Sequence, residues 1–146
     1  MYHRFDENKY PSTNIKISDF LKHLEIIKKN NMVFINPKNF EEELINNKGS
    51  RKILLTIDDG FSSFYQNAWP ILKKQNIPFI LFVSTREVGS FNYMTWDQIR
   101  EISKEKFVEI GNHSHTHEYL VDESNDAIKA DIQKSIDIFK KELGKN

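Results

Sequence analysis

Short apolar runs alternate with longer amphipathic stretches along the chain, and this alternation predicts an α/β fold. The strongest strand signals are the nearly continuous apolar runs at residues 52–57 and 79–83. Weaker strands are expected at residues 2–5, 32–35 and 107–110. Because such apolar runs are typical of parallel strands buried on both faces, the pattern predicts an open doubly wound sheet or part of a (β/α) barrel.

Amphipathic helices are expected between the strands, from apolar residues that recur every three or four positions. The first four cover about residues 18–30, 37–47, 62–75 and 95–103, and the last helix ends at Gly144. Ser18 is expected to cap the first helix, and Thr95 to open the fourth through a capping box with Gln98. Pro70 is expected to kink or split the third helix.

Large side chains on these helices are expected to pack inward, because they recur at helical spacing. Those assigned to the core are Phe40, Leu44 and Ile45 in the second helix, and Phe61, Phe64, Tyr65 and Trp69 around the third. Trp96, in the first turn of the fourth helix, is also expected to pack, with stacking on a sugar as the alternative.

Two polar clusters each follow a predicted strand, and in both candidate folds functional residues gather at the carboxyl ends of strands. The later cluster contains three of the five histidines, His113, His115 and His117. A spacing of four places two imidazoles on one face of a helical turn, whereas a spacing of two suits a strand end. Either arrangement predicts a site for a divalent metal ion.

The earlier cluster is Asp58 and Asp59, directly after the strongest predicted strand. Two adjacent carboxylates at a buried strand end are costly unless a cation offsets their charge, although Asp-Asp-Gly is also a common solvated turn. One aspartate can complete a site of two histidines and one carboxylate with open positions, leaving the other as a general base. The residues alone leave open which aspartate has which role.

The segment Thr56-Ile57-Asp58-Asp59-Gly60 resembles the first motif, Thr-Phe-Asp-Asp-Gly, of the polysaccharide deacetylase family (NodB-homology enzymes, carbohydrate esterase family 4). His113-Ser114-His115-Thr116-His117 resembles the second motif, His-(Ser or Thr)-x-x-His. The segment at residues 93–98 is similar to the one that leads into that motif. The start, Tyr2-His3-Arg4, resembles the branch that acts on poly-N-acetylglucosamine and other surface glycans.

This resemblance implies a distorted, incomplete (β/α) barrel of the NodB type. It implies that Asp59, His113 and His117 bind a divalent metal, usually zinc. Asp58 would be the general base, and Ser114 would fix the loop through a hydrogen bond. The implied reaction removes N-acetyl groups from an amino-sugar glycan, such as poly-N-acetylglucosamine or peptidoglycan, and leaves a free amine and acetate.

Two later motifs of the family are not found. The third motif, an Arg or an aromatic residue ahead of Pro-Tyr or Pro-Phe, does not follow the last predicted helix, and no histidine follows His117 to act as the catalytic acid. We therefore expect residues 1–146 to be a polysaccharide deacetylase domain without its C-terminal part, either as a piece of a longer enzyme or as a truncated member. Such a barrel would expose a strand edge and apolar faces, so self-association is expected.

The composition of the chain limits which classes of binding partner and chemistry are expected. The 21 basic and 21 acidic side chains give a formal net charge of zero, which argues against a nucleic-acid-binding surface. Cysteine is absent, which excludes disulfides and thiol nucleophiles. No apolar run reaches the roughly 18 residues of a membrane span, and the first residues do not resemble a signal peptide, so the compartment stays open.

Two alternatives to the deacetylase are kept. The first is an inactive remnant that binds metal and carbohydrate but lacks the general acid. The second is a metal-dependent phosphoesterase or amidohydrolase, since His-x-His also marks those barrels. In those enzymes the signature normally lies on the first strand, whereas here it follows the Asp-Asp pair.

Overall fold

The computed structural model describes residues 1–46, 49 and 51–144. The strands are β1 (Arg4–Phe5), β2 (Asn14–Ile15), β3 (Val33–Phe34), β4 (Lys52–Ile53), β5 (Thr56–Ile57), β6 (Phe79–Val83) and β7 (Val108–Asn112). The α-helices are α1 (Ile17–Lys29), α2 (Phe40–Ile45), α3 (Trp69–Gln75), α4 (Trp96–Ser103) and α5 (Asn125–Leu143). Short helical turns of other types are η1 (Pro37–Asn39), η2 (Phe64–Ala68) and η3 (Leu120–Asp122).

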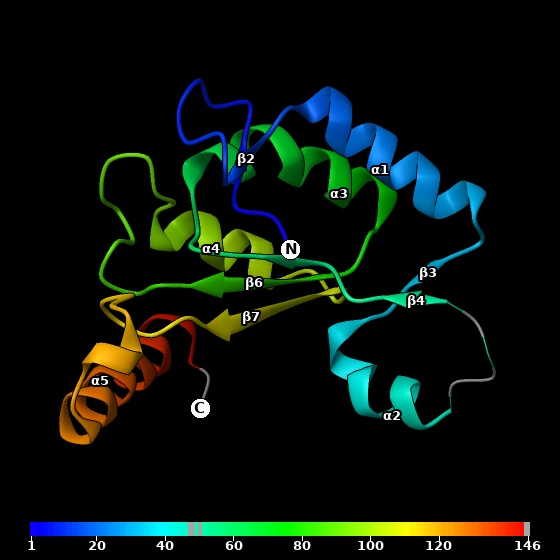
Figure 1. Ribbon diagram of the computed structural model, residues 1–146. Helices are drawn as coiled ribbons and strands as arrows, with labels where there is room; N and C mark the ends of the chain where they lie inside the picture. The colour runs from blue at the N-terminus through cyan, green and yellow to red at the C-terminus, as the bar shows by residue number, and fades with distance from the viewer. Residues whose placement is uncertain (47–48, 50, 145–146) are drawn as a thin grey trace.

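All strand pairs of the described chain are parallel, in agreement with the sequence pattern. The main sheet has the order β5-β6-β7, and β1–β2 and β3–β4 form two small separate pairs. Tyr2 bridges Ile57, so the N-terminal segment lies beside β5. The ribbon shows α1 and α3 on one side of β6 and β7 and α5 on the other (Figure 1).

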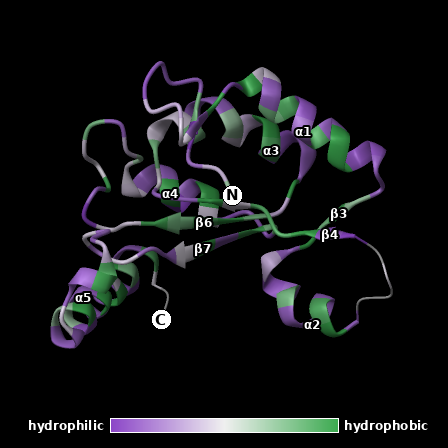
Figure 2. Ribbon diagram, viewed as in Figure 1, coloured by the Kyte–Doolittle hydropathy of each residue, from purple (hydrophilic) through white to green (hydrophobic). Residues whose placement is uncertain are grey.

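The hydrophobic core lies between the main sheet and helices α1, α3 and α4. Its largest fully buried side chains include Phe5, Phe20, Phe64, Phe79, Leu72, Leu81, Met94 and Ile99. Hydrophobic residues run along β6, whereas α1 and α2 show alternating hydrophobic and hydrophilic bands (Figure 2). The fold is a mixed α/β arrangement of parallel strands, and the described residues do not close into a barrel, as expected for the incomplete barrel.

Several predicted elements are confirmed. Strand β6 covers the predicted residues, and α4 has the capping box in which Thr95 and Gln98 cap each other. Helix α5 ends at Gly144, which is left-handed with φ 64°. The expected break at Pro70 takes the form of a π-helical segment, Phe64–Ala68, directly before α3. Because Pro70 has no backbone N–H, it cannot donate a helical hydrogen bond, and the wider turn of the π-helical segment accommodates the missing donor.

Other predictions were wrong. The single strand at residues 52–57 is split, because β4 pairs with β3 whereas β5 pairs with β6. Strand β2 lies between the predicted first strand and first helix, where no strand was predicted, and α1 begins at Ile17 with Lys16, rather than Ser18, at its N-cap. The expected end of the second helix at Asn47 falls outside the described residues, and α2 ends at Ile45.

The inward orientation predicted for α2 was also wrong. The residues Phe40, Leu44 and Ile45 are 37%, 57% and 83% exposed. Helical spacing identifies an apolar face, but it does not supply a surface for that face to pack against.

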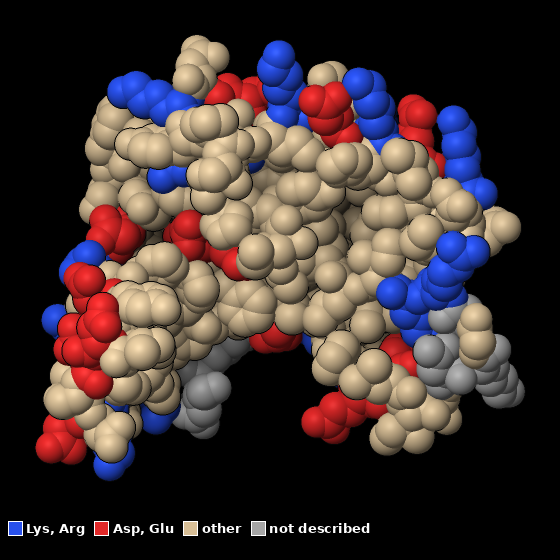
Figure 3. Space-filling view, viewed as in Figure 1, with Lys and Arg blue, Asp and Glu red and all other residues tan. Residues whose placement is uncertain are grey.

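Strand β7 is an edge of the main sheet. The surface below β7 is hollowed between α5 and α2, and positive and negative side chains alternate along the upper edge over α1 (Figure 3). The expected self-association through an open edge of this kind stays a prediction.

Candidate metal centre

The main sheet brings the two polar clusters together. Asp58 and Asp59 follow β5, and His113 follows β7, and both strands flank β6 in parallel. Their carboxyl ends therefore meet at one edge of the sheet, on the side where the chain turns from β7 toward α5 (Figure 1). This is the edge where parallel α/β sheets place their functional residues.

Three side chains converge at this edge. Asp59 Oδ1 lies 3.3 Å from His113 Nε2 and 3.3 Å from His117 Nε2. The two Nε2 atoms lie 3.1 Å apart. Ligands about 2.0–2.1 Å from one tetrahedral ion lie about 3.3 Å from each other, so these separations suit a single small cation.

The polar groups of the cluster also fit a cation. Asp59 Oδ1 is buried and accepts no hydrogen bond from the described residues, which is costly for a carboxylate. The facing Nε2 atoms of His113 and His117 require a proton or a cation between them, because two unprotonated nitrogens would repel each other. A divalent ion would satisfy all three atoms at once.

The pKa shifts within the cluster favour a negative carboxylate beside a positive charge. Burial on its own raises the pKa of Asp59, but the imidazoles of His113 and His117 outweigh it and hold that pKa below its usual value. Contact with the Asp59 carboxylate raises the pKa of His113, against the effect of burial. The Asp59 carboxylate therefore stays charged, and it favours a positive charge on or beside the imidazoles.

Asp58 lies beside the cluster and outside it. The side chain is buried, its Oδ1 accepts no hydrogen bond from the described residues, and Oδ2 lies 3.9 Å from His3 Nε2. Burial raises the pKa of Asp58, with His3 and His113 acting in the opposite direction. His3, which follows Tyr2 into the site, thus lies beside this carboxylate.

The loop that carries the histidines is neither helical nor extended. Ser114 and His117 have left-handed backbones, with φ 66° and 59°, as does Asp59 with φ 72°. Each such conformation costs an L-residue roughly 1–2 kcal/mol, so surrounding contacts must hold it. Ser114 Oγ accepts a hydrogen bond from the backbone N–H of His117 at 3.0 Å, which closes the loop.

His115 faces away from the cluster. The residue is 9% exposed, and its Nδ1 lies 2.9 Å from Thr85 Oγ1. Sequence reasoning left His115 without a role and missed Thr85. It also missed Asp131 on α5, whose carboxylate accepts hydrogen bonds from the loop. A signal for Asp131 did exist, because it interrupts the apolar stripe of the last helix between Ile128 and Ile132.

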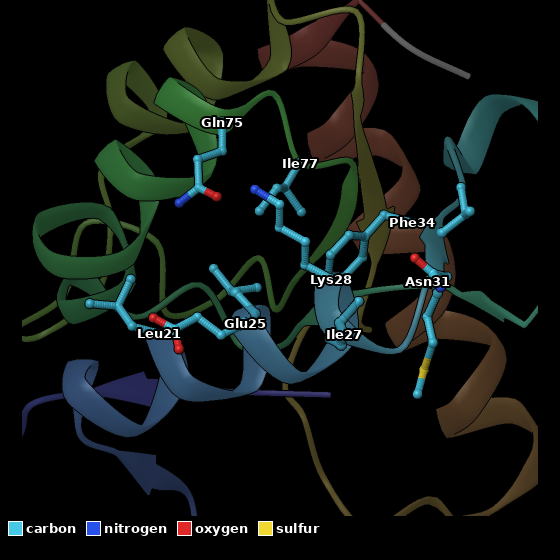
Figure 4. Close-up of a pocket in the computed structure, with 11 residues that line it drawn as sticks. Leu21, Glu25, Ile27, Lys28, Asn31, Phe34, Gln75 and Ile77 are labelled. Atoms are coloured by element: carbon cyan, nitrogen blue, oxygen red, sulfur yellow. The ribbon is translucent and has the colours of Figure 1, made fainter.

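A small cavity of about 160 Å³ adjoins Asp59 and His117 and is also lined by Tyr93 and Glu87. A larger groove of about 700 Å³ lies away from the cluster, between α1 and the end of α3 (Figure 4). Trp96, for which stacking on a sugar was the alternative, packs against α5 instead. Trp96 meets the Phe139 ring edge-on, with the ring centroids 5.9 Å apart.

The fold and the cluster define a class of protein. The sequence model of the polysaccharide deacetylase family matches residues 45–146, and the chain belongs to that family. Among the described residues, no helix is both long and apolar enough to cross a membrane.

Individual relatives agree with this assignment. Poly-β-1,6-N-acetyl-D-glucosamine N-deacetylase of Staphylococcus epidermidis is 27% identical over 149 aligned positions, which cover 91% of this chain and 52% of that protein. The Streptococcus pyogenes deacetylase PplD, solved in complex with acetate, superposes with a TM-score of 0.83 at 27% identity, covering 100% of this chain and 68% of that one.

IcaB from Ammonifex degensii shares the fold, with a TM-score of 0.86 at 24% identity over 99% of this chain and 68% of that one. The chain spans about half the length of the curated relatives that it matches.

Proposed function

We propose that this chain supplies the metal centre and the general base of a hydrolase that removes N-acetyl groups from an amino-sugar glycan. The observation that carries the proposal is the convergence of Asp59, His113 and His117 within 4.8 Å, beside Asp58, whose Oδ1 accepts no hydrogen bond from the described residues. The family match and the name of the Staphylococcus epidermidis relative support a poly-N-acetylglucosamine-like glycan as substrate.

Each residue has a proposed part. Asp59, His113 and His117 hold a divalent ion, for which we propose zinc because two imidazoles and one carboxylate are a common catalytic zinc set. When bound, such an ion polarises the acetyl carbonyl and stabilises the charge that develops on its oxygen. Asp58 takes a proton from the attacking water through its free Oδ1, and His3 helps to hold Asp58 in place. The cavity beside Asp59 is the proposed place for the acetyl group.

The test uses the full chain, three site variants and one control variant. Elemental analysis measures bound metal, and acetate release is measured from an acetylated β-1,6-linked glucosamine oligomer in the presence of Zn²⁺. We expect Asp59→Ala and His117→Ala to lose the metal. Asp58→Asn should keep the metal and lose about 10²–10⁴-fold in turnover, the usual contribution of a general base. Asp137→Asn, at an exposed position on α5, is the matched control and should change neither quantity.

The outcomes separate the alternatives. Equal metal content in the wild type, Asp59→Ala and His117→Ala would remove the metal site, and full activity in Asp58→Asn would refute the base assignment. Metal and glycan binding without acetate release would favour the inactive remnant. Hydrolysis of a phosphoester, with the acetylated oligomer left intact, would favour the phosphoesterase.

A further inference from the structure

We infer that Asp131 on α5 is a positioning residue, which fixes the histidine loop in the shape that lets His113 and His117 share one metal ion. This inference rests on the proposed metal site and adds to it a determinant outside the ligands and outside both motifs.

The Asp131 carboxylate accepts three hydrogen bonds from the loop. Its Oδ2 accepts a hydrogen bond from the backbone N–H of His115 at 2.8 Å. Its Oδ1 accepts two more, from the backbone N–H of Thr116 at 2.9 Å and from the Thr116 hydroxyl at 2.7 Å. All three donors therefore belong to the two residues immediately before the ligand His117.

A second residue of α5 holds the start of the loop. Ser135, one helical turn after Asp131, is fully buried and donates a hydrogen bond to Asn112 Oδ1 at 2.8 Å. The same oxygen accepts the backbone N–H of Ser114 at 2.8 Å. Residues spaced by four lie on one face of a helix, so α5 presents Asp131 and Ser135 to the loop together.

The end of β6 holds the opposite side of the loop. Ser84 Oγ donates to the carbonyl of His113 at 3.0 Å, and the backbone N–H of Arg86 donates to the carbonyl of His115 at 3.0 Å. The loop is thus fastened between β6 and α5. On the α5 side, Asp131 is the charged acceptor, and hydrogen bonds to a charged acceptor are stronger than those to a neutral one.

The position of the loop decides metal binding because the ligands depend on an unfavourable backbone. Ser114 and His117 are held in left-handed conformations, and the His117 side chain is 53% exposed, so packing alone does not fix it. Without the Asp131 carboxylate, the backbone N–H groups of His115 and Thr116 would donate hydrogen bonds to water instead. The loop could then relax away from the conformation that brings His113 and His117 together. Partners of this outer kind typically change metal affinity by about 10–100-fold.

The experiment titrates the metal-free full chain with Zn²⁺ against a chromophoric chelator, and records the visible absorption of the Co²⁺-substituted protein. Asp131→Asn keeps the size of the side chain but turns an amide NH₂ toward N–H donors. We expect its Kd for Zn²⁺ to rise by about 10–100-fold and its Co²⁺ bands to shift. Thr116→Val removes one of the three hydrogen bonds and should weaken binding less, but measurably. The control Asp137→Asn lies on the same helix and should match the wild type.

The Co²⁺ spectrum reports ligand geometry, which a general loss of stability would leave unchanged in the folded fraction. Wild-type affinity and an unshifted spectrum in folded Asp131→Asn would overturn the inference. If that variant does not fold, Thr116→Val decides: unchanged affinity counts against the inference and weaker binding supports it. A wild-type chain that fails to bind Zn²⁺ would instead refute the proposed function, so the two failures are distinguishable.

Discussion

The two ends of the parallel strands are built in different ways. At the carboxyl ends, the loop at residues 113–117 is fastened by hydrogen bonds to β6 and α5. At the other end lies a region that we call the outer lobe, made of β3, η1, α2 and β4. The outer lobe leaves Leu44 and Ile45 largely exposed, and it meets the start of β7 through Asn36, whose side chain donates to the Lys106 carbonyl at 3.4 Å.

The difference shows what each region has to achieve. Metal ligands must stay within a few tenths of an ångström of their positions, and directional hydrogen bonds to a rigid helix provide that restraint. The outer lobe carries no chemistry identified among the described residues, and the side chains of Leu44 and Ile45 on α2 face solvent. We therefore expect substitutions near the site to cost far more than equivalent substitutions in the outer lobe.

The largest expected contrast uses the same substitution in both regions. Leu81 is fully buried on the central strand β6, and Leu44 on α2 is 57% exposed. Leu81→Ala should lower the free energy of unfolding by about 2–5 kcal/mol, because it removes buried methyl groups and leaves a cavity. Leu44→Ala should cost about 0.5 kcal/mol or less. Urea unfolding curves measure both, and equal losses would show that the outer lobe is as tightly packed as the sheet.

The region at the carboxyl ends of the strands was predicted well from the sequence. The apolar runs located β6 and β7, and the two polar clusters that follow strands located the group formed by Asp59, His113 and His117, because strand ends of a parallel sheet meet by topology. The family motifs then separated the part of Asp58 from that of Asp59, which spacing alone left open. The structure places Asp59 with His113 and His117, and it places Asp58 beside them.

A second prediction concerns close packing directly before the site. A Cβ added at Gly111 on β7 would lie 2.5 Å from the ring of Phe82, which itself packs near His113. Gly111→Ala should cost about 1–3 kcal/mol through overpacking and displace the Phe82 ring toward the site. In a Phe82→Ala background the cost of Gly111→Ala should fall sharply, because the ring is gone. Purely additive effects in this double-mutant cycle would contradict the steric explanation.

The outer lobe and the loop contacts were poorly predicted, for separate reasons. The exposure of α2 could not be foreseen, because periodicity describes one helix and burial depends on its neighbours. The split of residues 52–57 into β4 and β5 depends on which strands pair, which local sequence does not encode. Asp131 and Thr85 act through contacts with residues far away in the chain, so their parts emerge only from the folded structure.

A third prediction uses pH to isolate the loop restraint. Burial on its own raises the pKa of Asp131, but hydrogen bonds from Thr116 and from the amides of His115 and Thr116 outweigh it and lower that pKa. A lowered folded-state pKa stabilises the fold above the unfolded pKa of about 3.9, and this stability is lost as the pH falls through the folded value. At pH 7 the free energy of unfolding of the wild type should exceed that of Asp131→Asn by about 1–3 kcal/mol. Urea unfolding from pH 7 down to acid should show this gap shrinking below about pH 4, and a gap that widens would reverse the sign of the argument.

The smallest expected effect comes from the outer lobe. Ile45, the last residue of α2, is 83% exposed, so replacing it with lysine removes little buried apolar surface. A cation near a helix C-terminus is also favoured by the helix dipole, which offsets the small loss. Ile45→Lys should therefore change the free energy of unfolding by less than about 0.5 kcal/mol and leave Zn²⁺ affinity unchanged. A loss of more than about 1 kcal/mol would mean that Ile45 is covered in solution, for example by a second copy of the chain. Sedimentation of the wild type at increasing concentration would then test that explanation directly.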